Sequence, residues 1–388
     1  MANYSKDCCP MRLLFRTPHS AFRIRPMFLK PLIRVIMTAI TLSLFAACER
    51  GDEAPALILP DHPHIQYTGR IDFADPRAPV LFWPGTSVIS RFEGTSLKVQ
   101  LSDSGESFYN VFIDGNEAAP LVLDCQPGMQ VYELAGGLED GVHTVQLFRR
   151  TEDSTGPTFF GGWILDPGKK LTSPPPRPER RIEFIGNSIT CGMGNECVPG
   201  EDNSDLSKEN NYLAYGAITA RNLGAEYHCI AKSGIGIMIS WFDLIMPDFY
   251  DRLNPANPAS KWDFSRWQPQ VVVINLFQND SWLQDRLDPR PTPEEIIAHY
   301  RDFLGRVRGK YPEAHIFCTL GSMDATREGQ PWPGYVQSTA DRFRAEHNDG
   351  RIYTHFFAYD QQPRHPDLAQ HRRMAEELTG VIREKVGW

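Results

Sequence analysis

The chain has 388 residues, a length that suggests two domains once a targeting segment is set aside. Hydrophobic residues make up 41% of it and charged residues 23%, which is the composition of a globular protein with a packed core and excludes global disorder. The formal net charge of -8 argues against a general nucleic-acid-binding protein, because that function needs a basic surface.

The N-terminal segment has the pattern of an export signal. Within residues 27–48, two basic residues precede an apolar run at 35–47, which is too short to span a bilayer well. Two alanines then precede Cys48, an arrangement that resembles the lipobox of bacterial lipoproteins, in which the cysteine is acylated after cleavage. We therefore expect an exported protein, in the outer membrane or the periplasm, with a lipid anchor at Cys48 as its only membrane contact. A plain signal peptide cleaved near Ala47 is the alternative.

Residues 60–170 carry the pattern of short β-strands. Polar and apolar residues alternate in several short runs, as in half-buried strands, and turn sequences such as the Asp-Gly-Asn at 114–116 separate these runs. Several strands at this spacing predict a β-sandwich, most simply a jelly roll. The proline-rich stretch from 171 to 178 predicts an extended linker to the next domain.

Strand and helix patterns alternate from residue 178 to residue 388. The apolar run at 271–274 predicts a buried strand, and the Thr-Pro-Glu-Glu sequence at 292–295 is a capping box that predicts the start of a helix. The alternation predicts a three-layer α/β/α domain with a parallel sheet, and functional sites of such sheets lie beyond the carboxyl ends of the strands. The expected strands are 181–185, 226–231, 270–276, 315–320 and 352–356.

Two residues beside the predicted strands are candidates for a nucleophile and its base. Ser188 directly follows a strand and a glycine, where its hydroxyl can attack and its own N–H can stabilise an oxyanion; a helix N-cap is the alternative. His365 directly precedes the last predicted helix, and histidine is the usual general base for a serine. The other histidines on predicted helices are expected to be surface or core residues.

Two further segments offer hydrogen-bond donors. The glycines between residues 231 and 236 let the backbone N–H groups approach a ligand, although an ordinary tight turn has the same composition. Asn279 follows the strand at 270–276, where its side-chain N–H can point at a developing oxyanion; the alternative is an Asn–Asp turn bonded to its own backbone.

Serine, glycine, asparagine and histidine in this order resemble the four sequence blocks of the SGNH (GDSL-type) hydrolases. The resemblance covers residues 181 to 388 and implies that Ser188 is the nucleophile and first oxyanion donor, and that His365 is the general base. It also implies that the second donor is the backbone N–H of Gly236, with Gly234 as the nearby alternative. The third implied donor is the side chain of Asn279.

The N-terminal part resembles the jelly-roll domain of carbohydrate esterase family 2. The motifs are Phe-Trp-Pro-Gly-Thr at 82–86, Val-Phe-Ile-Asp-Gly at 111–115 and Arg-Arg-Thr-Glu at 149–152. That family joins such a domain to an SGNH domain, and its members deacetylate plant polysaccharides such as xylan and glucomannan. The resemblance implies a serine esterase that removes acetyl groups from carbohydrate, with acetylated carbohydrate as its partner and no metal or organic cofactor. A binding protein without hydrolase activity, and an SGNH lipase or thioesterase, are the alternatives.

The chain departs from the SGNH pattern beside its base. An aspartate normally stands three residues before the histidine, and Gln362 holds that place here. We therefore expect a Ser188–His365 dyad, with the histidine oriented by a backbone carbonyl or by Gln362. Asp360 serves instead if the loop bends.

Two other sequence features raise structural questions. Phe277 stands where glycine is frequent in the family, which is expected to narrow the acyl pocket. Cys191 and Cys197 are close enough in sequence for a local disulfide, which export permits, although a buried free thiol is equally compatible with each.

Overall fold

The computed structural model describes residues 54–359 and 365–388. The expected signal segment with Cys48 lies outside the described residues, as do Asp360 and Gln362. Among the helices that are described, none has both the length and the apolar character needed to span a membrane.

The N-terminal part is a β-sandwich, as predicted. Its two antiparallel sheets have the strand orders β3-β4-β11-β6-β9, with β1 also on β11, and β12-β5-β10-β7-β8, with β2 also on β5. The indole N–H of Trp163 in one sheet donates to Ser90 Oγ in the other across 2.9 Å, inside an otherwise apolar core. The strands are β1 Ala56–Ile58, β2 Gln66–Thr68, β3 Ile71–Asp72, β4 Val80–Leu81, β5 Ser87–Gly94, β6 Leu97–Asp103, β7 Phe108–Ile113, β8 Leu121–Asp124, β9 Gly128–Ala135, β10 Gly141–Arg149, β11 Thr158–Leu165 and β12 Leu171–Thr172.

The segment predicted as an extended linker begins instead as part of the sandwich. Strand β12 pairs with β5, with Leu171 opposite Phe92. Further along, the carbonyl of Pro175 accepts a hydrogen bond from Gln66 Nε2 at 2.6 Å. The linker prediction for 171–178 is therefore wrong at its start, because an extended backbone satisfies its polar groups against an available sheet edge.

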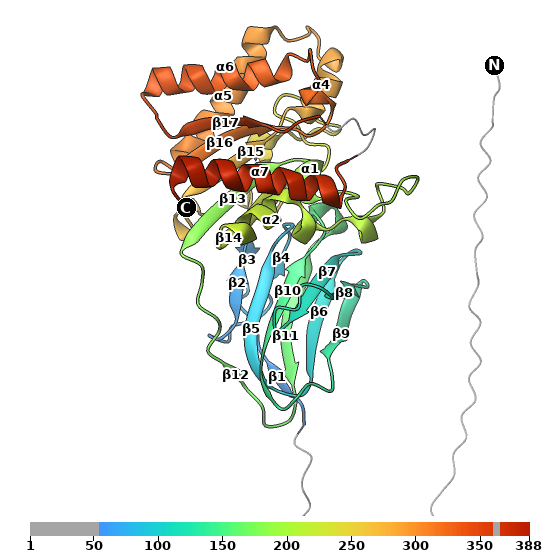
Figure 1. Cartoon of the computed structure of the whole chain (residues 1–388). Helices are drawn as coiled ribbons and strands as arrows, with labels where there is room; N and C mark the ends of the chain where they lie inside the picture. The colour runs from blue at the N-terminus through green and yellow to red at the C-terminus, as the bar shows by residue number, and fades with distance from the viewer. Residues whose placement is uncertain (1–53, 360–364) are drawn as a thin grey trace, which may run out of the picture. The chain divides into compact units, whose positions relative to one another are not determined.

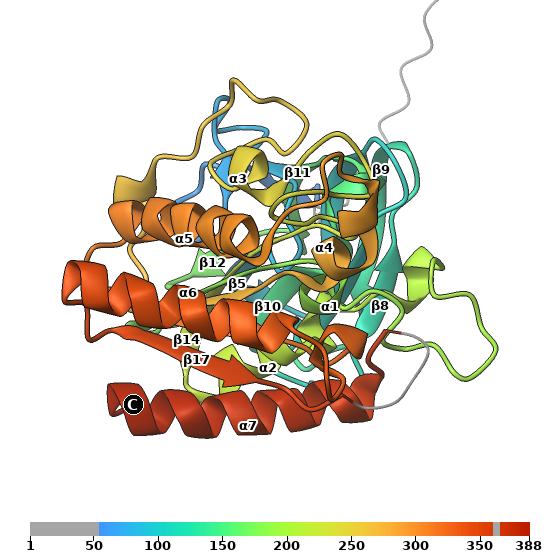
Figure 2. The ribbon, with the colours of Figure 1, turned by 90° about the horizontal axis from the view of Figure 1, so that it is seen from above.

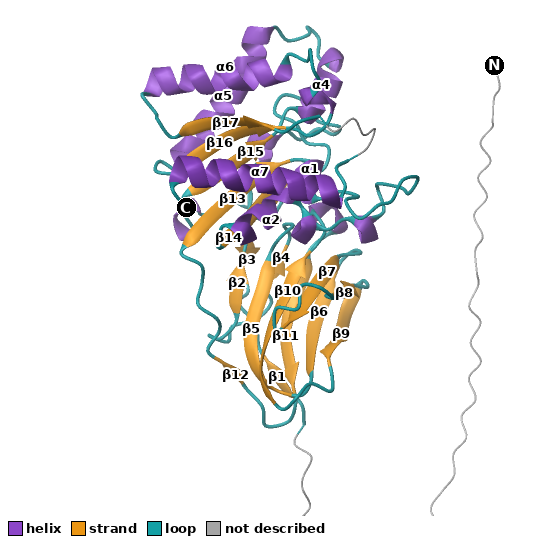
Figure 3. Cartoon of the chain, in the orientation of Figure 1, coloured by secondary structure: helices purple, strands orange, loops and turns teal. Residues whose placement is uncertain are grey.

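The C-terminal part is the predicted three-layer α/β domain. Its five-stranded parallel sheet has the order β14-β13-β15-β16-β17, with α2 and α7 on one face and α5 and α6 on the other (Figures 1 and 2). Among the described residues the longer helices belong to this part, and the sandwich consists of strands and loops with one short helical turn (Figure 3). The elements are β13 Arg180–Gly186, α1 Ser188–Cys191, α2 Tyr215–Asn222, β14 Ala225–Ala231, α3 Met246–Phe249, β15 Val271–Asn275, α4 Gln278–Leu283, α5 Pro293–Lys310, β16 His315–Leu320, α6 Trp332–His347, β17 Ile352–Phe356 and α7 Leu368–Val386.

Side-chain caps fix the starts of the two longest helices. The predicted capping box of α5 is present, since Thr292 Oγ1 accepts from the Glu295 N–H and the Glu295 carboxylate accepts from the Thr292 N–H. Helix α7 begins in the same way, with Asp367 capping the N–H of Gln370. Each such cap contributes about 1 kcal/mol to helix stability. The cap on α7 therefore also fixes the chain two residues after His365.

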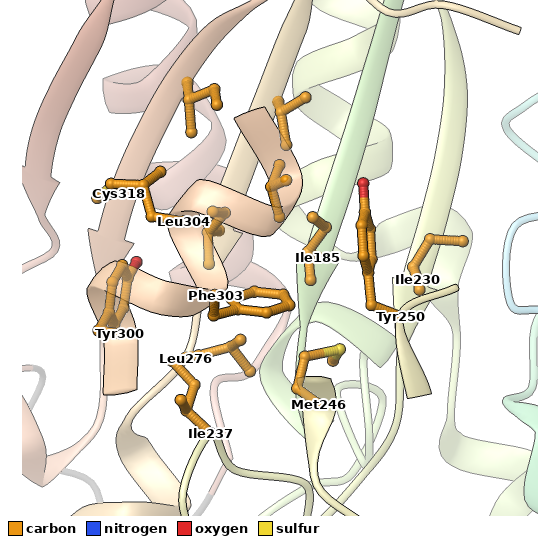
Figure 4. Packing of buried hydrophobic residues seen from close by; sticks show 14 of the residues in the cluster. Ile185, Ile230, Ile237, Met246, Tyr250, Leu276, Tyr300, Phe303, Leu304 and Cys318 are labelled. Carbon is orange, nitrogen blue, oxygen red and sulfur yellow. The ribbon is translucent and has the colours of Figure 1, made fainter. Parts of the chain in front are cut away.

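A hydrophobic core attaches α5 to the parallel sheet. Tyr300 and Phe303 of α5 share one core cluster with Ile185 of β13 and Leu276, which follows β15, and all four side chains are nearly or completely buried (Figure 4). Burial of each such side chain stabilises the fold by roughly 1.5–3 kcal/mol. This packing holds the carboxyl ends of β13 and β15 in a fixed relation, and these are the strand ends that precede Ser188 and Asn279.

A buried ion pair joins the sandwich to the α/β domain. Arg70, which precedes β3, lies 3.3 Å from Glu183 on β13, and both side chains are fully buried. Glu183 also accepts hydrogen bonds from the hydroxyl groups of Tyr250 and Tyr311 at 3.1 and 3.0 Å. A buried charge pair with this many partners holds a fixed geometry, because breaking it would leave an uncompensated charge in the interior. The described residues accordingly belong to one compact unit.

Cys191 and Cys197 do not form a disulfide. The Cys191 side chain is a buried free thiol that lies 3.8 Å from Glu152 Oε2, which excludes the local disulfide with Cys197. The Cys197 thiol lies 3.4 Å from the carbonyl oxygen of Asp202.

Candidate active site

Ser188 lies directly beyond the carboxyl end of β13. The last residue of that strand is Gly186, where an added Cβ would come within 2.0 Å of Thr190 Oγ1, so only glycine fits. Asn187 caps the short helix α1 by accepting the N–H of Ile189 at 3.1 Å, and Ser188 is the first residue inside that helix. The alternative in which Ser188 itself is the N-cap is therefore wrong, and its hydroxyl is left for another partner.

That partner is His365. Ser188 Oγ and His365 Nε2 lie 2.8 Å apart, although the two residues are separated by 177 positions in the chain. Desolvation by burial lowers the pKa of His365 from 6.5 to about 4, so the ring is neutral at neutral pH. A neutral imidazole nitrogen at this distance can accept the serine proton, which is the geometry required of a general base.

Among the described residues, the His365 ring has a hydrogen bond to Ser188 and to no other group. Among residues 54–359 and 365–388, no carboxylate has a hydrogen bond to the His365 ring, and the lowering of its pKa has burial as its cause. Asp360 and Gln362 lie outside the described residues. Orientation of His365 by either of them therefore stays a prediction.

The expectation for Gly236 requires a correction. Its N–H already donates to Ser240 Oγ at 3.0 Å, and an added Cβ would come within 2.1 Å of the Ile239 carbonyl oxygen. Its role is thus to let residues 236–240 fold back on themselves. The alternative glycine, Gly234, has a φ of +82°, which favours glycine, and its N–H has no acceptor among the described residues.

The side chain of Asn279 is held in one orientation. It belongs to α4, just beyond β15, and its Nδ2 donates to the carbonyl of Ile235 at 2.7 Å. Its Oδ1 accepts from the indole N–H of Trp241 at 3.2 Å. An amide nitrogen carries two hydrogens, so one N–H remains for a ligand. The alternative of a side chain bonded to its own turn is wrong for Asn279.

Two carboxylates from the sandwich hold the loop that precedes Gly234. Glu152 Oε2 accepts the N–H of Ser233 at 2.7 Å, and Asp153 pairs with Lys232 at 2.9 Å. Burial raises the pKa of Glu152. This role of Glu152 could not be predicted from the sequence, although the residue closes the Arg-Arg-Thr-Glu motif at 149–152. The sequence contains no pattern that predicts a contact between this motif and Ser233.

Asp280 fixes the other side of the same loop. Its buried carboxylate accepts the backbone N–H groups of Ile237 and Met238 at 3.0 and 2.7 Å, and of Ile239 at 3.3 Å. Desolvation is the largest effect on this group and raises the pKa of Asp280 to about 6. The loop after β14 is thus held by carboxylates on both sides of Gly234.

The Phe277 ring lies in the hydrophobic core and not in an acyl pocket. The residue's φ of +83° lies in the left-handed region, which accounts for the frequent glycine at this place. Its ring is fully buried and packs against Tyr300 and Trp332, with ring centres 4.9 and 5.1 Å away. The ring belongs to the hydrophobic core, so the expected narrowing of an acyl pocket by Phe277 is not supported.

The exposed surface near Asn279 contains aromatic rings. Trp241, whose indole contacts Asn279, is 53% exposed, and Trp282 on α4 is 41% exposed. The Trp282 indole N–H donates to the Asp324 carboxylate at 2.9 Å, which holds the ring. Among the described residues, no cluster of histidine, cysteine or carboxylate side chains could hold a metal ion.

A serine hydroxyl within hydrogen-bond distance of a neutral histidine is the arrangement that serine hydrolases share. Residues 184–382 match the GDSL-like Lipase/Acylhydrolase family, and residues 67–175 match the N-terminal domain of carbohydrate esterase 2. The chain belongs to the family 2 carbohydrate esterases.

Known relatives resemble nearly the whole described chain. The cellulase/esterase CelE of Acetivibrio thermocellus is 37% identical over 340 residues, which are 84% of this chain but only 40% of that longer protein. An acetylxylan esterase / glucomannan deacetylase of Cellvibrio japonicus is 29% identical over 335 residues, 84% of this chain and 90% of the relative. The structure of a family two carbohydrate esterase from Clostridium thermocellum in complex with cellohexaose is similar with a TM-score of 0.77 and 36% identity, covering 84% of this chain and 99% of that one.

Proposed function

We propose that this protein is a serine esterase that removes acetyl groups from carbohydrate. The observation that carries the proposal is the 2.8 Å contact between Ser188 Oγ and His365 Nε2 at the carboxyl edge of the sheet. The relatives named as an acetylxylan esterase / glucomannan deacetylase and as a cellulase/esterase support acetylated polysaccharide as the substrate class.

In the first half of the reaction, Ser188 Oγ attacks the acetyl carbonyl carbon while its proton passes to Nε2 of His365. The carbonyl π electrons move onto oxygen, and the resulting oxyanion is stabilised by the backbone N–H groups of Ser188 and Gly234 and by the second N–H of Asn279. The tetrahedral intermediate collapses by breaking the bond to the sugar oxygen, which takes the proton from His365. The products are a free sugar hydroxyl and an acetyl ester on Ser188.

In the second half, water replaces the sugar. His365 accepts a proton from water as the water oxygen attacks the acetyl-Ser188 carbonyl, and the same N–H groups stabilise the second oxyanion. Collapse breaks the bond to Ser188 Oγ, which recovers a proton from His365, and acetate leaves. The chain's own groups are sufficient for each of these proton transfers.

We further propose that the histidine acts in a dyad with Ser188. The 2.8 Å contact between Ser188 Oγ and His365 Nε2 supports this, as does Gln362 at the place where an aspartate is usual. Export and acylation at Cys48 complete the proposal, and they rest on the sequence pattern at residues 27–48. Replacement of Cys48 by alanine should abolish incorporation of labelled fatty acid, and retained labelling would contradict the anchor.

The direct test of the function uses Ser188→Ala. The purified variant should retain the wild-type unfolding transition and lose hydrolysis of acetylated xylan, acetylated glucomannan and simple acetyl esters. A parallel comparison of acetyl with octanoyl esters in the wild-type protein should favour acetyl. Turnover by Ser188→Ala at the wild-type rate would rule out the nucleophile, and a preference for octanoyl esters would replace the substrate class with lipid.

A further inference from the structure

A cavity lies toward the amino ends of β13 and β14, whereas Ser188 follows the carboxyl end of β13. It has a volume of about 350 Å³, and its lining includes Arg181 near the amino end of β13 and His228 on β14. Gly69 and neighbouring residues of the sandwich form another wall, where β2 contacts β14 (Figure 1). Small-molecule sites typically measure about 300–1,000 Å³, so this cavity has room for one small ligand.

Two buried N–H groups in the lining have no acceptor. His228 is 2% exposed, and its Nε2 accepts the N–H of Gly69 at 3.1 Å, so the ring proton is on Nδ1. Within residues 54–359 and 365–388 that Nδ1–H has no partner, and neither does the indole N–H of Trp262, which is 6% exposed. Buried donors without acceptors are rare and costly in native proteins, and a bound water, ion or ligand is the usual explanation.

The same cavity is bordered by an excess of guanidinium groups. Arg177 is engaged by Glu226 at 3.1 Å, and Glu226 also accepts the indole N–H of Trp267 at 2.8 Å, so the one carboxylate in the lining is occupied. Arg181 and Arg266 line the cavity too, and their side chains have neither an ion pair nor a hydrogen-bond acceptor among the described residues. The cavity is therefore rich in donors and positive charge and poor in acceptors.

Its walls are also flat and aromatic. The rings of His228 and Trp267 stack with their centres 3.5 Å apart and their planes within 4°, and Trp262 packs edge-on against His228. The Arg266 guanidinium lies over the Trp262 ring at 5.4 Å, where it is held beside the cavity. The rings make the cavity walls flat, and guanidinium groups suit a carboxylate, which they bind with two parallel hydrogen bonds.

We propose that this cavity is a second binding site, separate from the esterase centre, for a carboxylate-bearing sugar such as a uronic acid residue. The carboxylate supplies the acceptor that Arg181, Arg266 and the orphaned N–H groups lack. The sugar part of the proposal rests on the proposed function, whereas the need for an anionic acceptor rests on the cavity alone. Such a site would let the protein bind an acidic side group of a polysaccharide while acetyl groups are removed elsewhere.

Isothermal titration calorimetry of the mature protein with sodium glucuronate tests the proposal. Glucuronate should bind saturably. Glucose has the same ring without the carboxylate, so it should bind at least about 10-fold more weakly, because it offers no anionic acceptor to the guanidinium groups. Sodium sulfate is the third titrant. If sulfate binds as tightly as glucuronate, the site is one for inorganic anions and the sugar assignment is overturned.

Substitution of the arginines that line the cavity tests whether glucuronate binds there. Arg181→Gln and Arg266→Gln should each weaken glucuronate binding by about 10-fold or more, while Arg301→Gln, an exposed arginine of α5 paired with Glu346, should leave it unchanged. All three should keep the wild-type rate on an acetyl ester, so loss of binding is distinguishable from failure of the esterase function. Absence of saturable binding, or equal binding by all variants, would overturn the proposal.

Discussion

The two domains contribute to the candidate active site in different ways. The α/β domain carries Ser188, Asn279 and His365, each placed by the end of a strand or the start of a helix. The sandwich carries none of the reacting groups, yet its Glu152 and Asp153 hold the loop that presents Gly234. The difference teaches that one domain fixes the side chains proposed to react, whereas both domains together position the loop that carries the proposed backbone donor, Gly234.

This division of roles implies a ranking of mutational effects. Loss of a reacting group should reduce the rate most, loss of a donor less, and loss of a sandwich residue that only positions a donor least. Each of the following experiments either supports that ranking or breaks it.

Removal of the general base should have the largest effect. His365→Ala leaves Ser188 without an acceptor for its proton, so kcat for an acetyl ester should fall by about 10⁴-fold or more. Steady-state kinetics on the purified variant measure the loss, with circular dichroism as the check on folding. A fall of less than about 10-fold would mean that another group accepts the proton.

Removal of the side-chain donor should have the next largest effect. Asn279→Ala deletes one oxyanion donor and should lower kcat by roughly 10²–10³-fold with little change in KM. Because Asn279 also holds Ile235 and Trp241, Asn279→Asp is the matched comparison that keeps the shape and removes the N–H groups. Near-normal kcat in Asn279→Asp would show that the side chain acts on the loop and not on the oxyanion.

Removal of the sandwich contact should have a smaller effect on the same parameter. Glu152→Ala frees the Ser233 N–H and lets the donor loop shift, so kcat should fall by about 10–100-fold while KM changes little. Glu152→Gln retains an acceptor oxygen and should restore most of the rate. Glu117→Ala, at an exposed sandwich carboxylate 3.8 Å from Arg221, is the control and should behave as wild type. Equal rates for Glu152→Ala and the control would show that the sandwich does not contribute to the active site.

A mildly acidic pH should have the smallest effect on the rate of hydrolysis. The reaction needs neutral His365, and a pKa of about 4 keeps the ring neutral well below the usual range. The value of kcat/KM should therefore stay nearly constant between pH 7 and 5.5, whereas a histidine with the ordinary pKa would lose about 10-fold activity over that interval. A pH profile with a folding check at each pH measures this, and an acid limb centred near pH 6.5 would contradict the lowered pKa of His365.

The sequence predicted those parts of the site that depend on local pattern. Alternation of strands and helices placed Ser188 and Asn279 beyond strand ends and His365 before the last helix, because these positions follow from periodicity and capping. The choice between Gly234 and Gly236 could not be made in this way. It depends on which N–H is taken up by Ser240, and that is decided by how the loop folds back.

The sequence also could not reveal contacts made by docking of the domains. Glu152 and Ser233 belong to different domains and are separated by 81 positions, so no periodic pattern connects them. The linker was misjudged for a related reason, since Leu171 and its neighbour find hydrogen-bond partners on β5 that only the folded sandwich presents.

Trapping of the covalent intermediate tests the central claim most directly. Mass spectrometry of the intact protein, quenched rapidly during turnover of an activated acetyl ester, should show a gain of one acetyl group, and peptide mapping should place it on Ser188. The adduct should be absent from Ser188→Ala and should persist longer in Asn279→Asp, whose second half-reaction lacks a donor. An acetyl group found on any other residue, or steady turnover with no dependence on Ser188, would contradict the account.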